Sequence, residues 1–564
     1  MVVLALALGQ ALANLFLPGL MATIVDNGIV HNDPRYIWTT GGLMLLVALG
    51  GILCAIVGIF CSSRIALRFG KSIRNQVFTH VMSFSPAEFD TVSTASLITR
   101  TTNDTTQVQN ALVLFLNVMV TAPITMIGGI ILAINQDLGL SWIFAVAIPL
   151  LLAVILFLMS QAIPLFTVIQ SKLDRLNLIL NENLTGVRII RAFDRTNYEE
   201  QRFDQANREL TRVAITVNRL VSSLMPILLL ILNLSSIAII WFDAIRINTE
   251  KMQVGSLFAF LQYAMQILFA LLMASMMVAM LARASAAATR INQVLAIQPS
   301  IIDADQVKSP DNLGGYVEFQ DVTFSYPGAE EPALTHISFA ARPGEVTAII
   351  GGTGAGKSTL VSLIPRFYDI DHGRILVNGV DVREIAQEQL RARIGFVPQK
   401  ALLFSGTIAE NIRFGNDNAS LAEVEHVAEV AQASEFIARL PERFEAEIAQ
   451  SGSNLSGGQK QRLSIARALI RRPEIYIFDD SFSALDFKTE ARLRAALKKE
   501  TLNSTVLIVA QRINTVMNAD QIIVLDEGQI AGLGTHRKLM NTCEVYREIV
   551  SSQLSSQELE EEFA

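Results

Sequence analysis

Six long apolar segments fill the N-terminal half of the chain, and they constrain its fold more than any other feature. They cover approximately residues 2–27, 37–62, 112–135, 138–166, 220–245 and 254–282. About 20 apolar residues are enough for a helix to cross a bilayer. Because backbone polar groups inside a bilayer must be satisfied within the segment, each one is expected to be a transmembrane helix. Hydrophobic residues make up 51% of the 564 residues and charged residues 17%, which excludes an ordinary soluble protein.

The connections between the segments alternate in length and in charge. They are short after the first, third and fifth segments (28–36, 135–138 and 246–253) and long after the second and fourth (63–111 and 167–219). The basic residues are Arg64, Arg68, Lys71, Arg74, Arg100, Lys172, Arg175, Arg188, Arg191, Arg195, Arg202, Arg208, Arg212 and Arg219 in the long connections, and Arg35, Arg246 and Lys251 in the short ones. Because positively charged connections stay in the cytoplasm, the long ones are expected there, and six crossings return the chain to that side.

The two long connections are expected to be extensions of the membrane helices. Neither shows the periodic apolar pattern of a core-forming domain, which disfavours the alternative of a separate soluble insertion. The helices would continue beyond the bilayer and turn near Ser85–Ser93 and near Asn181–Val187. At these tips they would contact the C-terminal half of the chain.

The sixth segment is rich in methionine and aromatic residues, whereas charges inside the segments are scarce. Asp26, Asp137 and Asp243 lie near segment ends, which argues against an ion relay through buried carboxylates. Methionine and aromatic surfaces adapt to varied apolar ligands. The candidate cavity residues are Phe258, Met265, Phe269, Met273 and Met277. The alternative for each of them is a role in packing or in contact with lipid.

A glycine-rich sequence in the C-terminal half fits the pattern G-x-x-x-x-G-K-[ST]. An apolar strand is expected before it at 346–350 and a helix after it from Thr359, which disfavours a simple glycine-rich turn. Backbone N–H groups of such a loop converge on phosphate at a helix N-terminus. The candidate phosphate-binding residues are Gly351, Thr353, Gly354, Ala355, Gly356, Lys357, Ser358 and Thr359. Lys357 is expected to reach the β- and γ-phosphates and Ser358 to hold Mg²⁺, so the chain is predicted to bind a nucleoside triphosphate.

Further candidate residues surround this loop in the sequence. Tyr326 precedes it by about 25 residues and could stack on adenine, although a tyrosine before a proline is also a common strand end. Gln399 ends a strand and could reach Mg²⁺ or the attacking water. The motif of Leu455, Ser456, Gly457, Gly458 and Gln459 opens a helical run and suits a phosphate. Asp479 ends an apolar strand and is placed to hold Mg²⁺.

These motifs, in this order and followed by Ser483–Asp486, resemble an ABC ATPase. With six preceding spans, essentially the whole chain resembles the exporter-type half-transporters of that superfamily. The resemblance implies a dimer with twelve spans and two ATP molecules sandwiched head to tail. Each ATP would lie between one chain's phosphate loop and the other chain's LSGGQ. It also implies that Tyr326 stacks on adenine, that Gln399 is the Q-loop glutamine and that Ser483–Asp486 is the D-loop.

The chain departs from the family pattern at three places. Asp480 stands where the general base is usually glutamate, and Gln511 stands where a switch histidine is usual. Ala449-Gln450 replaces a Gly-Glu pair that usually precedes LSGGQ. The shorter aspartate withdraws the carboxylate by more than about 1 Å, and a misplacement of that size can cost on the order of 10²-fold in rate. Glutamine cannot become a cation near neutral pH as histidine can. ATP binding is therefore expected to survive while hydrolysis at this site suffers.

These departures favour the degenerate-site subunit of a heterodimeric bacterial multidrug exporter. The intact LSGGQ would then serve the ATP site of a different partner chain. An accidental or engineered change at Asp480 would have to explain Gln511 as well. The open alternatives are a homodimeric lipid or peptide exporter and an ATP-regulated membrane protein that does not transport. The expected substrates are drugs or other small amphipathic compounds, and the formal net charge of −7 gives no sign of nucleic-acid binding.

The expected fold is an all-α transmembrane domain followed by an α/β P-loop domain. The expected boundaries are a transmembrane domain at 1–295, a linker at 296–315, an ATP-binding domain at 316–550 and an acidic tail at 551–564. The first segment begins almost at Met1 without a basic region before it, so a cleaved signal peptide is not expected. The expected location is the inner membrane of a bacterium, with the ATP-binding domain in the cytoplasm.

Overall fold

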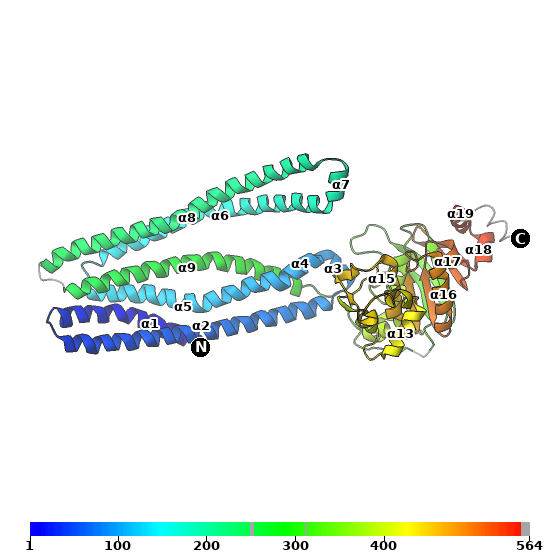
Figure 1. Ribbon diagram of the computed structural model, residues 1–564, viewed down its shortest axis with the longest axis horizontal. Coiled ribbons are helices and arrows are strands. Elements are labelled where there is room, and N and C mark those ends of the chain that lie inside the picture. Colours follow the sequence, from blue (N-terminus) through cyan, green and yellow to red (C-terminus); the bar gives the residue numbers. More distant parts are fainter. Residues whose placement is uncertain (249–252, 311–312, 554–564) are drawn as a thin grey trace. The chain divides into compact units, whose positions relative to one another are not determined.

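The computed structural model describes residues 1–248, 253–310 and 313–553, which form two compact units (Figure 1). The first unit contains Met1–Met82 and Thr94–Ala296. The second contains Ser83–Ser93 and the chain from Ile297 onward. Of the acidic tail expected at 551–564, residues 551–553 belong to the last helix (Glu544–Gln553), and residues 554–564 lie outside the described residues. A short segment of the first long connection therefore belongs to the unit that holds the C-terminal half.

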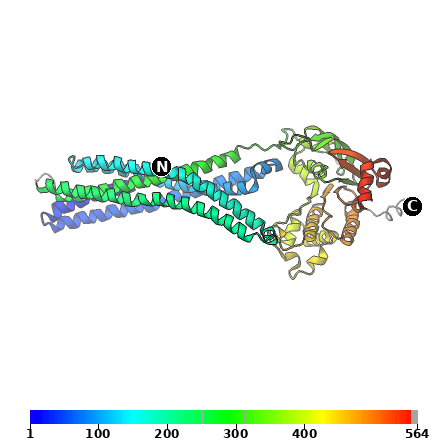
Figure 2. The ribbon, with the colours of Figure 1, turned by 90° about the horizontal axis from the view of Figure 1, so that it is seen from above.

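The first unit is built from long helices (Figures 1 and 2). They are α1 (Val2–Thr23), α2 (Pro34–Met82), α4 (Thr94–Thr99), α5 (Thr105–Gln136), α6 (Trp142–Thr185), α7 (Val187–Ala192), α8 (Thr196–Asn248) and α9 (Val254–Leu295), with π-helical turns at Ile24–Ile29 and Arg100–Asp104. In the described part of the chain, six helical stretches are long and apolar enough to cross a membrane. The six-helix prediction is therefore confirmed.

The long connections of the sequence are helical extensions. Helix α2 has 49 residues, which at about 1.5 Å per residue is more than twice the thickness of a hydrocarbon core. Helices α6 and α8 lie side by side and are joined at their far end by α7 (Figures 1 and 2). The turn between them lies at Gly186, the last part of the predicted tip. The alternative of a separate soluble insertion does not occur.

Small residues let the helices of the first unit approach closely. A Cβ atom at Gly128 would lie 2.5 Å from Leu15 Cδ1, and one at Gly129 would lie 2.9 Å from Ile267 Cγ1. At the centre of this packing, the rings of Phe144 and Phe260 stack with centroids 4.7 Å apart. Dispersion contacts of this kind hold apolar helices together where lipid already surrounds them.

The second unit is an α/β domain with two larger sheets and a short two-stranded ribbon. The six-stranded sheet has the order β12-β11-β3-β10-β9-β6 and is parallel apart from β12, and the four-stranded antiparallel sheet has the order β2-β1-β4-β5. The strands are β1 (Val317–Phe324), β2 (Leu334–Ala341), β3 (Val346–Gly351), β4 (His372–Val377), β5 (Val380–Asp381), β6 (Ile394–Val397), β7 (Gly406–Thr407), β8 (Glu447–Ile448), β9 (Ile475–Asp479), β10 (Thr505–Val509), β11 (Gln521–Asp526) and β12 (Gln529–Gly534).

The helices of the second unit pack around these sheets. They are α3 (Pro86–Val92), α10 (Lys357–Leu363), α11 (Gln387–Ala392), α12 (Ile408–Arg413), α13 (Leu421–Val430), α14 (Ser434–Ile437), α15 (Gly457–Leu469), α16 (Phe487–Glu500), α17 (Ile513–Val516), α18 (His536–Thr542) and α19 (Glu544–Gln553), with 3₁₀ turns at Val382–Glu384, Arg443–Glu445 and Gln450–Gly452. The α/β prediction is thus confirmed. Parallel strands place their carboxyl ends along one edge, where ligands of such sheets bind.

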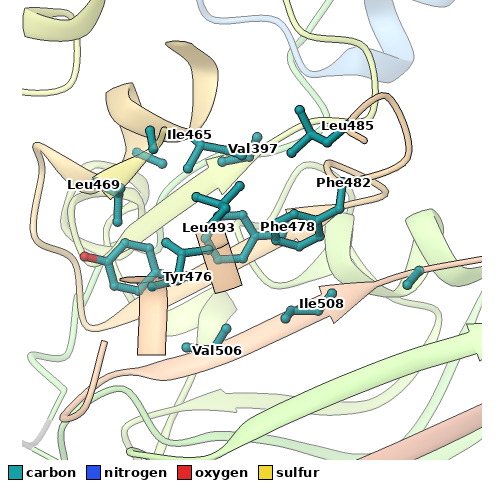
Figure 3. Packing of buried hydrophobic residues seen from close by; sticks show 14 of the residues in the cluster. Val397, Ile465, Leu469, Tyr476, Phe478, Phe482, Leu485, Leu493, Val506 and Ile508 are labelled. Atoms are coloured by element: carbon teal, nitrogen blue, oxygen red, sulfur yellow. The ribbon is translucent and has the colours of Figure 1, made fainter. Parts of the chain in front are cut away.

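Strand β9 is buried over its whole length, and this burial fixes its carboxyl end (Figure 3). Tyr476 and Phe478 project from the same face of β9, with parallel rings whose centroids lie 6.1 Å apart. Phe478 also packs against Phe482, which follows the strand, and Leu493 of α16 lies in the same cluster. Burial raises the pKa of Tyr476 to about 12. Each fully buried side chain of this size stabilises the fold by about 1.5–3 kcal/mol. This packing therefore holds the carboxyl end of β9, where Asp479 lies, in a fixed position.

Helix α3 is anchored to the chain that follows the last membrane helix. It begins with a capping box in which the Ser85 N–H donates to Glu88 Oε2 over 2.6 Å. The other oxygen, Glu88 Oε1, accepts from the Ser300 N–H over 3.1 Å. These hydrogen bonds favour the charged form and lower the pKa of Glu88, although burial, the largest single influence, opposes them. One buried carboxylate therefore ties the tip expected at Ser85–Ser93 to the segment that leads into β1.

Candidate nucleotide-binding site

The glycine-rich loop lies between β3 and α10 and has a backbone that requires glycine. Gly354 and Gly356 adopt positive φ angles of 86° and 91°. A Cβ atom at Gly356 would lie 2.8 Å from Leu334 Cδ2 and 3.0 Å from the Ala333 carbonyl oxygen. Larger side chains are excluded there by both strain and space. The loop Gly351–Thr359 thus has the conformation that a phosphate-binding backbone needs.

Lys357 and Ser358 begin α10, and their side chains contact the ends of β3 and β9. Lys357 Nζ donates to the carbonyl oxygens of Gly351, over 2.9 Å, and Gly352, over 2.6 Å. Burial lowers the pKa of Lys357, and the nearby Asp480 and Asp479 oppose that shift. Ser358 Oγ donates to Asp479 Oδ1 over 2.8 Å. The ammonium group and the hydroxyl therefore lie beside the loop, and their expected contacts with phosphate and Mg²⁺ stay predictions.

Asp480 is the centre of a hydrogen-bonded group that contains all three candidate catalytic residues. Its Oδ2 atom accepts from Gln511 Nε2 over 2.9 Å and from Gln399 Nε2 over 3.2 Å. Asp480 is buried and has a positive φ of 45°. Burial raises the pKa of its carboxyl group, while the Gln399 hydrogen bond and the Lys357 charge oppose the shift. The structure thus brings together residues that lie far apart in the sequence.

The donors near Ser358 suit Mg²⁺ bound together with nucleotide phosphates. Within the described residues, no group of three or more His, Cys, Asp or Glu side chains could hold a metal ion by itself. Mg²⁺ is usually held by one or two carboxylates together with substrate phosphates. Ser358 Oγ and Asp479 Oδ1 are adjacent oxygen donors of that kind. Gln399 keeps an amide oxygen for the predicted role, since its nitrogen binds Asp480.

Tyr326 lies beside the phosphate loop with its ring partly accessible. Its side chain is 38% exposed, and its hydroxyl lies 2.9 Å from Thr359 Oγ1. Tyr368 packs edge-on against the ring with centroids 5.3 Å apart, and Phe324 does so at 5.0 Å. This packing fixes the orientation of Tyr326. Sequence reasoning missed Tyr368, because nothing local to that position marks it.

The LSGGQ residues form the N-terminus of α15 on an accessible surface. Ser456 is the N-cap: its N–H donates to Gln459 Oε1 over 2.8 Å, and its Oγ accepts from the Gln459 N–H over 3.4 Å. A Cβ atom at Gly457 would meet nothing within 4 Å. One at Gly458 would lie 3.0 Å from the Ala484 carbonyl oxygen. The motif is thus preorganised by its own helix cap and touches the Ser483–Asp486 loop.

The position of Gln511 is fixed by a residue that sequence reasoning did not identify. Gln553, at the end of α19, donates from Nε2 to the Gln511 carbonyl oxygen over 2.8 Å. Its Oε1 accepts from the Ile513 N–H over 2.8 Å. One side chain therefore holds the backbone on both sides of Arg512. No local motif marks Gln553, since the contact joins positions about 40 residues apart.

The first unit contains a cavity of about 820 Å³ between α1, α2, α5, α6, α8 and α9. Three candidate residues line it: Met265, Phe269 and Met273. Phe258, which is exposed, and Met277, which is buried, are not among the residues that line it. Three of the five candidate positions in the sixth segment thus lie at the cavity, and their role in substrate binding stays a prediction.

Comparisons with known proteins give the family. Residues 1–271 match the family described as ABC transporter transmembrane region, and residues 334–483 match the family described as ABC transporter. The chain is 44% identical over 552 residues to the uncharacterized ABC transporter ATP-binding protein Rv1273c of Mycobacterium tuberculosis, which covers 97% of this chain and 94% of that protein. It is also 30% identical to an ATP-dependent lipid A-core flippase of Syntrophus aciditrophicus, and this match covers 95% of this chain and 88% of that protein.

A solved structure agrees with these relatives. A bacterial Atm1-family ABC exporter with ATP bound superposes with a TM-score of 0.81 at 26% identity, covering 98% of this chain and 97% of that one. The six membrane helices identify an integral membrane protein, and its ATPase domain is cytoplasmic. An ABC ATPase domain binds ATP and couples its hydrolysis to transport. The chain therefore belongs to the ABC transporter family and is an exporter-type half-transporter, a membrane domain fused to an ABC ATPase.

Proposed function

We propose that this chain is the degenerate-site half of a heterodimeric exporter for amphipathic compounds, drugs among them. One observation carries the proposal: the Asp480 carboxylate is bonded to the amides of Gln511 and Gln399 at the end of β9. ABC exporters act as dimers in the bilayer. In such a dimer this chain would bind ATP through Lys357, Ser358 and Asp479 but hydrolyse it slowly.

The chemistry of the Asp480 group explains slow hydrolysis. A general base must reach the attacking water, and efficiency falls steeply with misplacement. Asp480 is one methylene shorter than glutamate, and two amide donors hold its Oδ2 atom. Hydrogen bonds to a carboxylate favour its charged form, so the Gln399 amide opposes the rise in the pKa of Asp480 that burial causes. Gln511 cannot supply a positive charge to the γ-phosphate, so neither usual contribution to catalysis is available.

The LSGGQ motif would serve the partner's ATP. Ser456 and Gly457 are exposed at the helix N-terminus, where a phosphate of a second chain's nucleotide can approach. ATP held at the weak site would keep the two ATPase domains together, and hydrolysis at the other site would reset the transporter. Charge stabilisation of the γ-phosphoryl group accounts for most of that catalysis.

A homodimeric lipid exporter is the second candidate. The 30% identity to a lipid A-core flippase over most of both chains favours it. It differs from the first candidate in needing no second kind of chain. Both candidates export an amphipathic molecule, so the ATPase assay separates them and a substrate assay does not.

The test is Mg-ATPase activity of this chain purified alone and then co-purified with a candidate partner half-transporter. Negligible turnover alone and rapid turnover together are expected. In the complex, Ser456→Ala is expected to lower turnover on the order of 10²-fold, the usual effect of removing one donor to a transition-state anion. Asp480→Asn is expected to lower it far less. Rapid turnover by the chain alone would overturn the proposal. A larger loss of turnover in Asp480→Asn than in Ser456→Ala would overturn it as well.

A further inference from the structure

The cavity in the membrane unit has an uncharged wall that combines apolar and carboxamide side chains. Among the described residues that line it, none carries a charge. Most are leucine, methionine and alanine, with Phe269 on α9. The polar side chains are Gln10, Asn14, Thr121, Thr125, Gln262 and Gln266. An apolar wall with a few convergent polar groups is the usual composition of a site that fixes one orientation of a ligand.

The carboxamides form two pairs on neighbouring helices. Gln10 and Asn14 are four residues apart on α1, and Gln262 and Gln266 are four residues apart on α9, so each pair lies on one helical face. Helices α1 and α9 are in contact. Four amide groups on two contacting helices therefore line the cavity, together with leucines that α8 contributes.

Gln266 lines this cavity, and its carboxamide holds a buried acceptor. Its Nε2 atom donates to the Asn14 carbonyl oxygen over 3.0 Å, which identifies Oε1 as the atom turned the other way. That oxygen is buried and has no hydrogen-bond partner among the described residues. A buried acceptor without a donor costs free energy until a ligand or water supplies one. The wall thus lacks a hydrogen-bond donor at one defined atom.

We infer that this cavity selects an uncharged amphiphile whose polar end donates hydrogen bonds, such as the hydroxyl groups of a glycoside. The inference rests on the proposed export of amphipathic compounds and narrows their class. A cation would find no carboxylate in this wall and a fatty acid would find no basic group, so either would lose its hydration without compensation. Hydroxyl groups would instead exchange hydrogen bonds with the amides of this wall, while an alkyl chain contacts the leucine and methionine side chains.

The experiment uses three ligands that share a dodecyl chain: the neutral maltoside, the trimethylammonium cation and the carboxylate. Binding to the full transporter in nanodiscs is measured without ATP, at ligand concentrations below micelle formation. The maltoside is expected to bind at least about 10-fold more tightly than either ion. Equal or tighter binding of the cation or the carboxylate would overturn the inference, and so would the absence of binding by all three.

Variants locate the effect at the amides. Gln266→Leu removes one of the four amides of this wall and is expected to weaken maltoside binding about 3- to 10-fold, the usual range for one hydrogen bond, without weakening cation binding. Gln266→Glu is expected to reverse the preference toward the cation. Gln161→Leu is the matched control, because Gln161 is an exposed glutamine on α6 outside the cavity lining. Equal loss in Gln161→Leu, or no loss in Gln266→Leu, contradicts the assignment.

The ranking of ligands on the unmodified protein requires no substitution, so a variant that fails to fold leaves the test intact. Gln262→Leu is the second variant on the same face. Because ligand binding is measured without nucleotide, the result of the binding experiment does not depend on which chain hydrolyses ATP. A homodimer that prefers the maltoside would refute the proposed pairing and support this inference, and a heterodimer that prefers the cation would do the reverse.

Discussion

The pair Asp480→Glu and Gln511→His should restore hydrolysis at this chain's own site. Moving a carboxylate by about 1 Å changes rate on the order of 10²-fold, which is about 2.7 kcal/mol of activation free energy. The Gln511 amide lies 2.9 Å from Asp480 Oδ2, and a hydrogen bond to a charged group is worth about 1.5–3 kcal/mol. The longer glutamate side chain must lose the hydrogen bond to Gln511 before its carboxylate can reach the attacking water. Asp480→Glu alone should therefore raise turnover only about 10-fold.

The double variant should therefore raise turnover about 10²-fold, which is more than the combined effects of the two single variants. Phosphate release is measured with saturating Mg-ATP for the variant in the assembled dimer, compared with the same dimer carrying the unmodified chain, and nucleotide binding is measured separately. Asp526→Glu is the control, because Asp526 is exposed at the end of β11. If the double variant binds ATP normally but gains no turnover over the unmodified chain, the account of Asp480 and Gln511 is wrong.

Three further outcomes follow from the geometry. Burial raises the pKa of the Asp480 carboxyl group above its ordinary 3.8, so ionisation of this group increasingly destabilises the folded chain as pH rises toward the native pKa. Asp480→Asn should therefore raise the melting temperature without nucleotide, and by more at pH 7.5 than at pH 5. Tyr326→Ala should weaken binding of a fluorescent ATP analogue by about 1–3 kcal/mol and Tyr326→Phe by less, since stacking uses the ring. Asp104 is fully buried and pairs with Arg290, whose side chain is 44% exposed. Arg290→Leu leaves the buried carboxylate without its partner and should lower the free energy of unfolding by about 3–5 kcal/mol, as measured by denaturant titration. Asp104→Asn removes the buried charge itself and should lower it by less.

The fold could be predicted from the sequence because its signals are local. Apolar segments of sufficient length give the six membrane helices, and the strand before Gly351 and the one ending at Asp479 are continuous apolar runs. The phosphate loop could be placed for the same reason, since its glycines and Lys357 are contiguous. The structure added the conformation that makes glycine necessary at 354 and 356.

The long-range contacts could not be predicted. Asp480, Gln511 and Gln399 were separate candidates, and only the order of β10, β9 and β6 in the sheet brings them into one hydrogen-bonded group. The cavity shows the same limit. Methionines of α9 stand out in composition, but Gln266 matters through its contact with Asn14 on another helix, and composition cannot pair them.

The contact of Gln553 with the backbone on both sides of Arg512 has a practical consequence for work with this protein. Helix α19 supplies both hydrogen bonds from one side chain, so the backbone around Gln511 depends on Gln553, outside every nucleotide-binding motif. A chain shortened before Gln553 would lose that support although every nucleotide-binding motif remained. Activities of shortened chains should therefore be compared only with a Gln553→Ala reference.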